Sequence, residues 1–169
     1  MMKFFMIFFM LFVINTDTQV IKLPQYYKGQ GVIFDKGTLY IAKDEDYLEP
    51  VQINIKNAIE VEELFLKQYY YRQIYFDKKF NQPLTSNKYH EPKYVKNKFR
   101  RYNRQYYGYL NKDHDTIVFL GLLNFKNKKI VKEYFYLWKE ELIFGSGDII
   151  YENRKLFWIN ISKDSIILK

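Results

Sequence analysis

Two apolar runs, Tyr102–Leu110 and Thr116–Phe125, alternate as β-strands do, and only turn-forming polar residues, Asn111–Asp115, separate them. This pattern predicts an antiparallel hairpin. The second run is apolar at both odd and even positions, so we expect it to be covered on both faces or to lie centrally in its sheet. Gly108 and Gly121 lack side chains in mid-strand, and we expect a helix to cross the sheet near them.

Upstream of this hairpin, Asn57–Phe76 has apolar side chains at spacings of three and four residues, which predicts an α-helix. Asn57 is a plausible N-cap, and acidic side chains follow it in the first turns, where the helix dipole favours negative charge. The apolar band is wide and rich in tyrosine. A helix of this kind packs on a sheet.

The remaining runs are short. Strands are predicted, with turns between them, at Val32–Phe34, Thr38–Ile41, Glu140–Phe144, Ile149–Tyr151, Leu156–Ile161 and Ser165–Leu168. The run Ile130–Trp138 fits either a helix or a strand. The whole pattern predicts an α+β fold in which one long helix packs across a mainly antiparallel sheet of four to six strands. Its order, β-α-β-β-β-β, is cystatin-like, a likeness of topology that carries no function.

The N-terminus carries Lys3, the apolar run Phe4–Ile14 and then a polar stretch, as a signal peptide does. The run is too short to span a bilayer, which needs about 17–25 residues. The alternative is a buried N-terminal strand. We expect residues 1–18 to be a signal peptide, residues 19–169 to be a single domain without a transmembrane span, and the protein to be secreted or periplasmic.

Composition narrows the possible chemistry. The chain has no cysteine, so disulfides, thiolate metal sites and cysteine nucleophiles are excluded. Its net charge is +8. An exported basic protein meets an anionic envelope component, an acidic polysaccharide or an acidic protein before it meets nucleic acid. AT-rich coding, which favours Lys, Asn, Ile, Tyr and Phe, is a second explanation of the same bias.

Residues 78–104 differ in kind from the rest, because they are basic, contain Pro83 and Pro92, and have few apolar positions. Connections of this length are usually functional loops or disordered. Cations interleaved with aromatic rings suit an anionic or stacking ligand, and Tyr and Arg are enriched at protein contacts; a solvated loop is the plain alternative. The predicted binding residues are Lys88, Tyr89, Tyr94, Lys96, Lys98, Arg100, Arg101 and Arg104. This predicts a non-enzymatic binding domain.

The alternative function is a small secreted hydrolase or a metal-dependent enzyme that uses His90 or His114. His114 has an aspartate on either side, but neighbouring residues in a turn point in different directions, and a triad needs partners from separate elements. Two histidines at unrelated positions are a weak metal signal. Gly145–Asp148 lacks the Gly-x-Ser-x-Gly spacing of a nucleophile elbow. No catalytic residue, cofactor or metal is therefore predicted.

The order of several short motifs in this chain is similar to that in a known group of proteins. Arg104-Gln105 precedes Tyr106-Tyr107-Gly108-Tyr109, and Trp138-Lys139-Glu140-Glu141 and Gly145-Ser146-Gly147-Asp148 follow the second strand. This order resembles small uncharacterised exported proteins of the Bacteroidota over residues 102–158. In those proteins an apolar strand and an Asp-Gly-Gly-type turn come after the tryptophan, whereas the turn here reads Gly-Ser-Gly-Asp. The resemblance implies export and the order of the strands.

Overall fold

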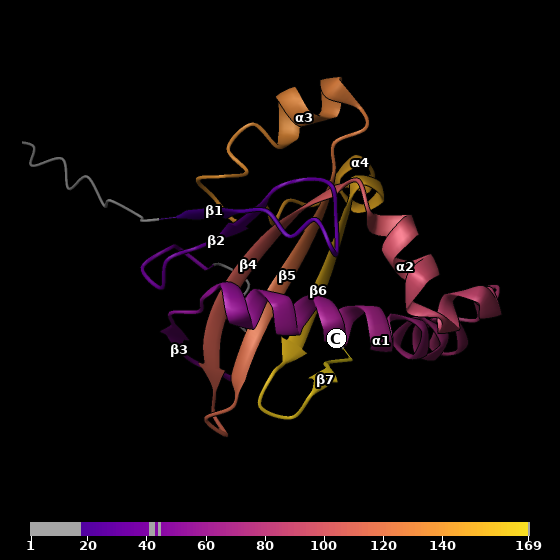
Figure 1. The fold of residues 1–169 in the computed structure, drawn as a ribbon, viewed down its shortest axis with the longest axis horizontal. Coiled ribbons are helices and arrows are strands. Elements are labelled where there is room, and N and C mark those ends of the chain that lie inside the picture. Colours follow the sequence, from indigo (N-terminus) through magenta and orange to yellow (C-terminus); the bar gives the residue numbers. More distant parts are fainter. Residues whose placement is uncertain (1–17, 41–42, 44, 169) are drawn as a thin grey trace, which may run out of the picture.

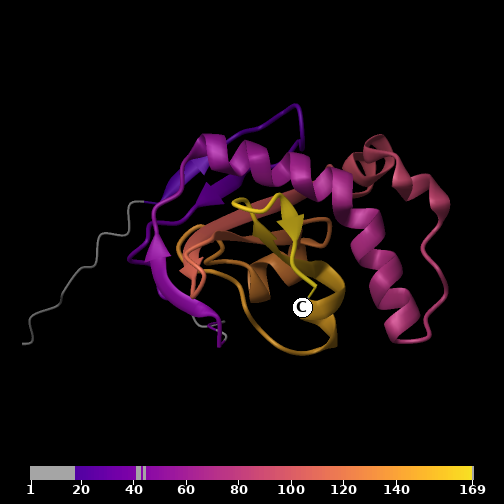
Figure 2. The same cartoon turned by 90° about the horizontal axis from the view of Figure 1, so that it is seen from below.

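The computed structural model describes residues 18–40, 43 and 45–168, which form an α+β fold with one seven-stranded, mainly antiparallel sheet. The helix α1 lies along one face of this sheet and extends past its edge (Figures 1 and 2). The strands are β1 Gln19–Ile21, β2 Gly31–Ile33, β3 Tyr47–Val51, β4 Tyr102–Asn111, β5 Thr116–Asn124, β6 Arg154–Asn160 and β7 Ser165–Ile166. The helices are α1 Ile55–Lys79, the 3-10 helix η1 Asn87–His90, α2 Pro92–Phe99, α3 Lys128–Tyr134 and α4 Asp148–Asn153. The predicted signal peptide, apart from Thr18, lies outside the described residues.

The predicted central hairpin is confirmed. β4 and β5 pair antiparallel, with Gly108 opposite Val118, and β5 is buried along most of its length between β4 and β6. Two short strands share the other edge of β4, because β2 pairs parallel with its first half and β3 pairs antiparallel with its second half. The sheet has more strands than predicted. Three of them precede α1, so the cystatin-like order is not confirmed.

The helix α1 is confirmed, but its first turn starts before the predicted cap. Asn54 is the N-cap, and its side chain accepts hydrogen bonds from the backbone N–H groups of Lys56 and Asn57. Asn57 returns a side-chain bond to the N–H of Asn54, which completes a reciprocal capping box. The buried side of the helix, including Val61 and Phe65, then packs on the sheet.

Aromatic side chains fill a second apolar layer on the opposite face of the sheet. Tyr107 and Phe119 belong there to the same buried cluster as Phe135 and Trp138. Gln105 is fully buried in this layer. Its amide nitrogen donates to two backbone carbonyls of residues 138–141, and its amide oxygen accepts from the N–H of Ile143. Gln105 thus provides hydrogen-bond partners for backbone groups of Trp138, Glu141 and Ile143, which in a sheet would pair with a neighbouring strand.

Several predictions of local structure were wrong. Residues 140–144 are irregular, because Gln105 takes the place of a neighbouring strand, and residues 38–40 are not a strand. The run Ile149–Tyr151 lies in α4, which follows the positive φ of Gly147. Residues 78–104 are not a structureless connection, since they contain η1 and α2.

The predicted crossing of a helix over the two glycines is also wrong. A side chain at Gly108 would collide with Ile53 and Val51, so the chain that enters α1 is what packs closely there. Gly121 lies on the other face, against the ring of Phe119 and beside Gln105. Within the described residues, no helix is both long and apolar enough to cross a membrane.

Candidate functional site

A hollow of about 760 Å³ is lined by residues from the far half of α1, the end of α2, the end of α4 and the start of β6. We call it the basic cleft. Four cationic side chains from three elements, α1, α2 and β6, line it: Arg72, Lys98, Arg154 and Lys155. Aromatic side chains form much of its wall: Tyr69, Phe99, Tyr102, Tyr151, Phe157 and Trp158. None of its lining residues is an aspartate or a glutamate.

Two lysines belong to opposite sides of this cleft. Lys98, on α2, donates from Nζ to the hydroxyl of Tyr69 at 2.7 Å and lies 4.7 Å from the centre of the Tyr89 ring. Lys155, on β6, donates to the backbone carbonyl of Tyr151 at 2.9 Å. Partial burial and the positive charge of Lys98 lower the pKa of Lys155. Two ammonium groups therefore repel each other in one aromatic-walled space, and a bound anion would relieve that repulsion.

Two arginines add charge that is partly removed from water. The guanidinium of Arg72 lies 4.7 Å from the centre of the Phe157 ring, and Nη1 of Arg154 donates to the carbonyl of Ile143 at 3.1 Å. Burial lowers the pKa of both arginines, yet an arginine stays protonated at any ordinary pH. A charge in a less polar environment attracts an opposite charge more strongly than one in open water.

The structure brings some of the predicted binding residues together and separates others. Lys98 lines the basic cleft, and Arg100 and Arg101 line an adjoining hollow of about 470 Å³. The two hollows share Lys98 and Tyr102. The other exposed or half-buried members of the predicted set, Lys88, Tyr89, Tyr94 and Lys96, lie on η1 and α2.

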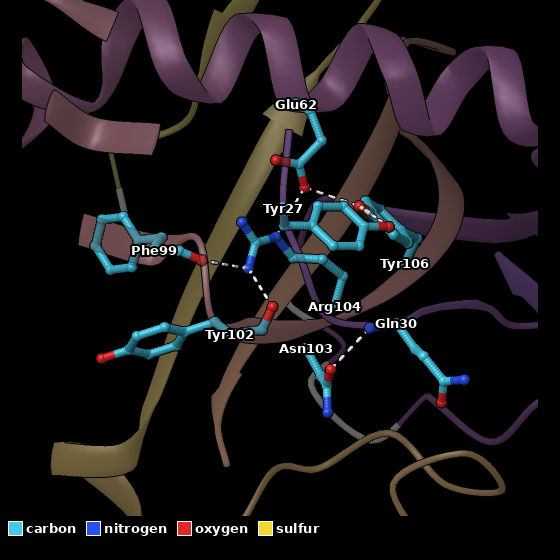
Figure 3. A network of polar contacts seen from close by, with 8 residues as sticks. All are labelled: Tyr27, Gln30, Glu62, Phe99, Tyr102, Asn103, Arg104 and Tyr106. Carbon is cyan, nitrogen blue, oxygen red and sulfur yellow. Dashed lines mark hydrogen bonds and ion pairs between the residues drawn. The ribbon is translucent and has the colours of Figure 1, made fainter. Parts of the chain in front are cut away.

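Arg104 does not belong to that surface, and its assignment to it was wrong. Only 1% of its side chain is exposed, because it lies under α1 and pairs with the fully buried Glu62 (Figure 3). Nε of Arg104 and Oε1 of Glu62 are 2.9 Å apart, and the hydroxyl of Tyr106 donates to the same oxygen at 2.7 Å. The hydroxyl oxygens of Tyr106 and Tyr27 lie 3.3 Å apart, within hydrogen-bond distance of each other.

This buried pair positions the candidate surface without being part of it. Nη1 of Arg104 donates to the carbonyls of Phe99 and Tyr102, at 3.1 and 2.8 Å. Those two carbonyls lie on either side of Arg100 and Arg101, so Arg104 ties the end of α2 to the start of β4 (Figure 3). The intervening arginines are exposed to solvent as a result.

Neither histidine lines the basic cleft. His114 is exposed in the turn of the β4–β5 hairpin with a φ of 60°. Its neighbour Asp115 binds Lys163 at 2.6 Å and Asn160 at 2.9 Å. Nε2 of His90 lies 2.7 Å from the hydroxyl of Tyr71. Among the described residues, no cluster of three or more His, Asp or Glu side chains could hold a metal ion.

Reasoning from the sequence missed most of the cleft. Lys155 and Arg154 were assigned to a polar turn between two strands, and Arg72 was one cation among the tyrosines of α1. They meet Lys98 only because α1 extends past the sheet and α2 folds back toward β4 (Figures 1 and 2). Comparison with known proteins adds no further residue, since neither a protein-family model, nor a curated protein, nor a solved structure matches this chain.

Proposed function

We propose that this protein is a non-enzymatic, exported binding domain that holds an anionic partner in the basic cleft. The export part of the proposal rests on the signal-peptide pattern of residues 1–18 and on the resemblance to small exported proteins of the Bacteroidota. Secreted and periplasmic locations both fit it. The partner is an anionic envelope component, an acidic polysaccharide or an acidic protein.

The supporting observation for binding is the convergence of Lys98 and Lys155. These two like charges come from α2 and β6, elements that the sheet and α1 bring together, and no acidic side chain lines the space that they share. The ion pairs that we find among the described residues involve neither lysine. An arrangement of like charges costs stability unless a ligand uses it.

Two carboxylates interact with the cleft lysines without lining the cleft, Asp77 with Lys98 and Glu152 with Lys155. Asp77, at the end of α1, is buried and accepts hydrogen bonds from Gln73 and from the backbone N–H of Thr85. Burial opposes its ionisation, but these bonds and the charge of Lys98 lower its pKa. Asp77 therefore fixes the loop that follows α1 as a charged, hydrogen-bonded group, and it stands behind the cleft wall.

A neutralisation experiment tests the proposal. Lys98→Gln combined with Lys155→Gln should weaken binding to a sulfated dextran matrix by at least about tenfold, because each charged hydrogen bond to a partly desolvated anion contributes about 1.5–3 kcal/mol. Binding is measured as the salt concentration at which the protein elutes and by titration calorimetry in solution.

The matched control is Lys36→Gln combined with Lys112→Gln. It removes the same net charge from two exposed lysines outside the cleft. We expect it to shift elution only slightly, since neither lysine lies where an anion in the cleft would bind and a distant charge is screened at physiological salt. If both double variants lose the same affinity, attraction is a property of the net charge of +8 alone, and the cleft is not the site.

A further inference from the structure

The basic cleft is one end of a longer track of positive charge. The adjoining hollow, which shares Lys98 and Tyr102 with the cleft, in turn shares Lys28 and Arg100 with a third hollow of about 440 Å³ that begins at Lys22. We call the three together the basic track. Within the part of the chain that the structure describes, no aspartate or glutamate lines any of them. Such a surface has more cationic positions than one compact anion can use, and it suits a ligand with many charges in a row.

Most of the aromatic rings that line this track are buried or have a cation of the protein beside them. Tyr69, Phe99 and Phe157 line the cleft but are almost completely buried. Tyr89, which lies next to the cleft residue Lys98, has two cations of the protein over its ring. Lys88 and Lys98 lie over Tyr89 at 5.2 and 4.7 Å.

Two other exposed rings of this region, those of Tyr94 and Tyr151, also have a cation beside them. Lys93 lies over Tyr94 at 4.9 Å, and the guanidinium of Arg154 is 5.9 Å from the centre of the Tyr151 ring. The rings therefore hold cations in place by cation–π contact. Proteins that bind single-stranded nucleic acid depend on open rings, because stacking contributes about 1–3 kcal/mol per base.

The concave shape of the basic track favours a flexible polymer chain over a flat membrane surface as its ligand. Lys98 is held against the wall of the cleft by its bond to Tyr69, and Arg72 and Arg154 are half-buried or buried. The plane of lipid headgroups cannot follow cations into successive hollows, whereas a polymer chain can.

We propose that the basic track binds a linear acidic polysaccharide, whose carboxylate or sulfate groups contact successive cations along the chain. The inference rests on the proposed function and adds the class of ligand. The sugar units need no aromatic stacking, and their charges repeat along a chain that can lie in the three hollows.

The experiment compares four probes with the purified protein at one salt concentration: a long polygalacturonate, a short oligomer of it, an oligothymidylate with the same number of charges as the long chain, and vesicles rich in phosphatidylglycerol. We expect the long polygalacturonate to bind at least about tenfold more tightly than each of the other three. The dependence of affinity on salt should be steeper for the long chain than for the oligomer, because more counterions are released.

Variants test whether the end of the basic track away from the cleft contributes to binding of the long chain. Lys28→Gln combined with Arg101→Gln should weaken binding of the long chain by about tenfold and leave the oligomer nearly unchanged, provided that the oligomer occupies the cleft. Circular dichroism melting shows that each variant is folded. Equal or tighter binding of oligothymidylate or vesicles overturns the polysaccharide assignment and leaves an anion-binding cleft intact. If none of the four probes binds, the proposed function itself falls.

Discussion

Replacing Arg104 by methionine tests whether the buried pair holds the domain together. The substitution keeps much of the side-chain volume but leaves the carboxylate of Glu62 buried without its cation, while Oε2 of that carboxylate already has no hydrogen-bond partner among the described residues. Removal of one member of a buried ion pair costs about 3–5 kcal/mol. A domain of this size has about 5–15 kcal/mol of stability in all.

The second member of the pair makes the prediction specific. With Glu62→Met added, neither member of the buried pair is charged, and the defect should shrink to about 1–3 kcal/mol, which is the cost of the unpaired carbonyls of Phe99 and Tyr102. The double variant should therefore be more stable than Arg104→Met alone. Such recovery is expected when the two charges are strongly coupled, so that the loss of one is costly mainly because the other is left buried without a partner.

Urea unfolding and thermal melting followed by circular dichroism measure these differences. Arg104→Met should lower the melting temperature by about 6–20 °C, since 1 kcal/mol corresponds to about 2–4 °C in a protein of this length. The exposed neighbour Arg101→Met is the control and should stay within about 0.5 kcal/mol. A change below about 1 kcal/mol for Arg104→Met, or a double variant no more stable than the single, refutes the reasoning.

Three further predictions concern the scaffold. Asn54→Ala should destabilise the domain by about 1 kcal/mol in urea unfolding, because it removes the N-cap of α1. Gly108→Ala should cost about 1–3 kcal/mol in the same assay, since the new methyl group meets Ile53 and the carbonyl of Val51; an unchanged midpoint would contradict the close approach. Burial raises the pKa of Tyr27 and of Tyr40 to about 12, above the value of about 10 in an unfolded chain. The folded state then retains protons that the unfolded state loses, so their contribution should persist below pH of about 10 and disappear between about 10 and 12, seen as a falling urea midpoint.

The buried pair also connects stability with the candidate surface. Arg104 binds the carbonyls on either side of Arg100 and Arg101, so a variant that loosens it releases the junction between α2 and β4. Binding at the adjoining hollow should then weaken along with stability. Arg104 thus positions the chain at this junction, whereas its exposed neighbours Arg100 and Arg101 do not.

Local patterns in the sequence determined the central elements. The alternation in residues 102–125 and the spacing in residues 57–76 reflect which side chains must leave water, and that requirement holds wherever the strand or helix finally packs. The hairpin β4–β5, the helix α1 and the strand β6 were predictable for this reason, as was the α+β class.

Tertiary structure decided what local patterns could not. Residues 140–144 have the composition of a strand, but the side chain of Gln105 satisfies part of their backbone. Arg104 has the same charge as Arg100 and Arg101, and only the position of Glu62 on α1 makes it a buried partner. The basic cleft has the same origin, because its cations lie far apart in the sequence and meet only through the packing of α1, α2 and β6, which depends on contacts between distant segments and not on any local period.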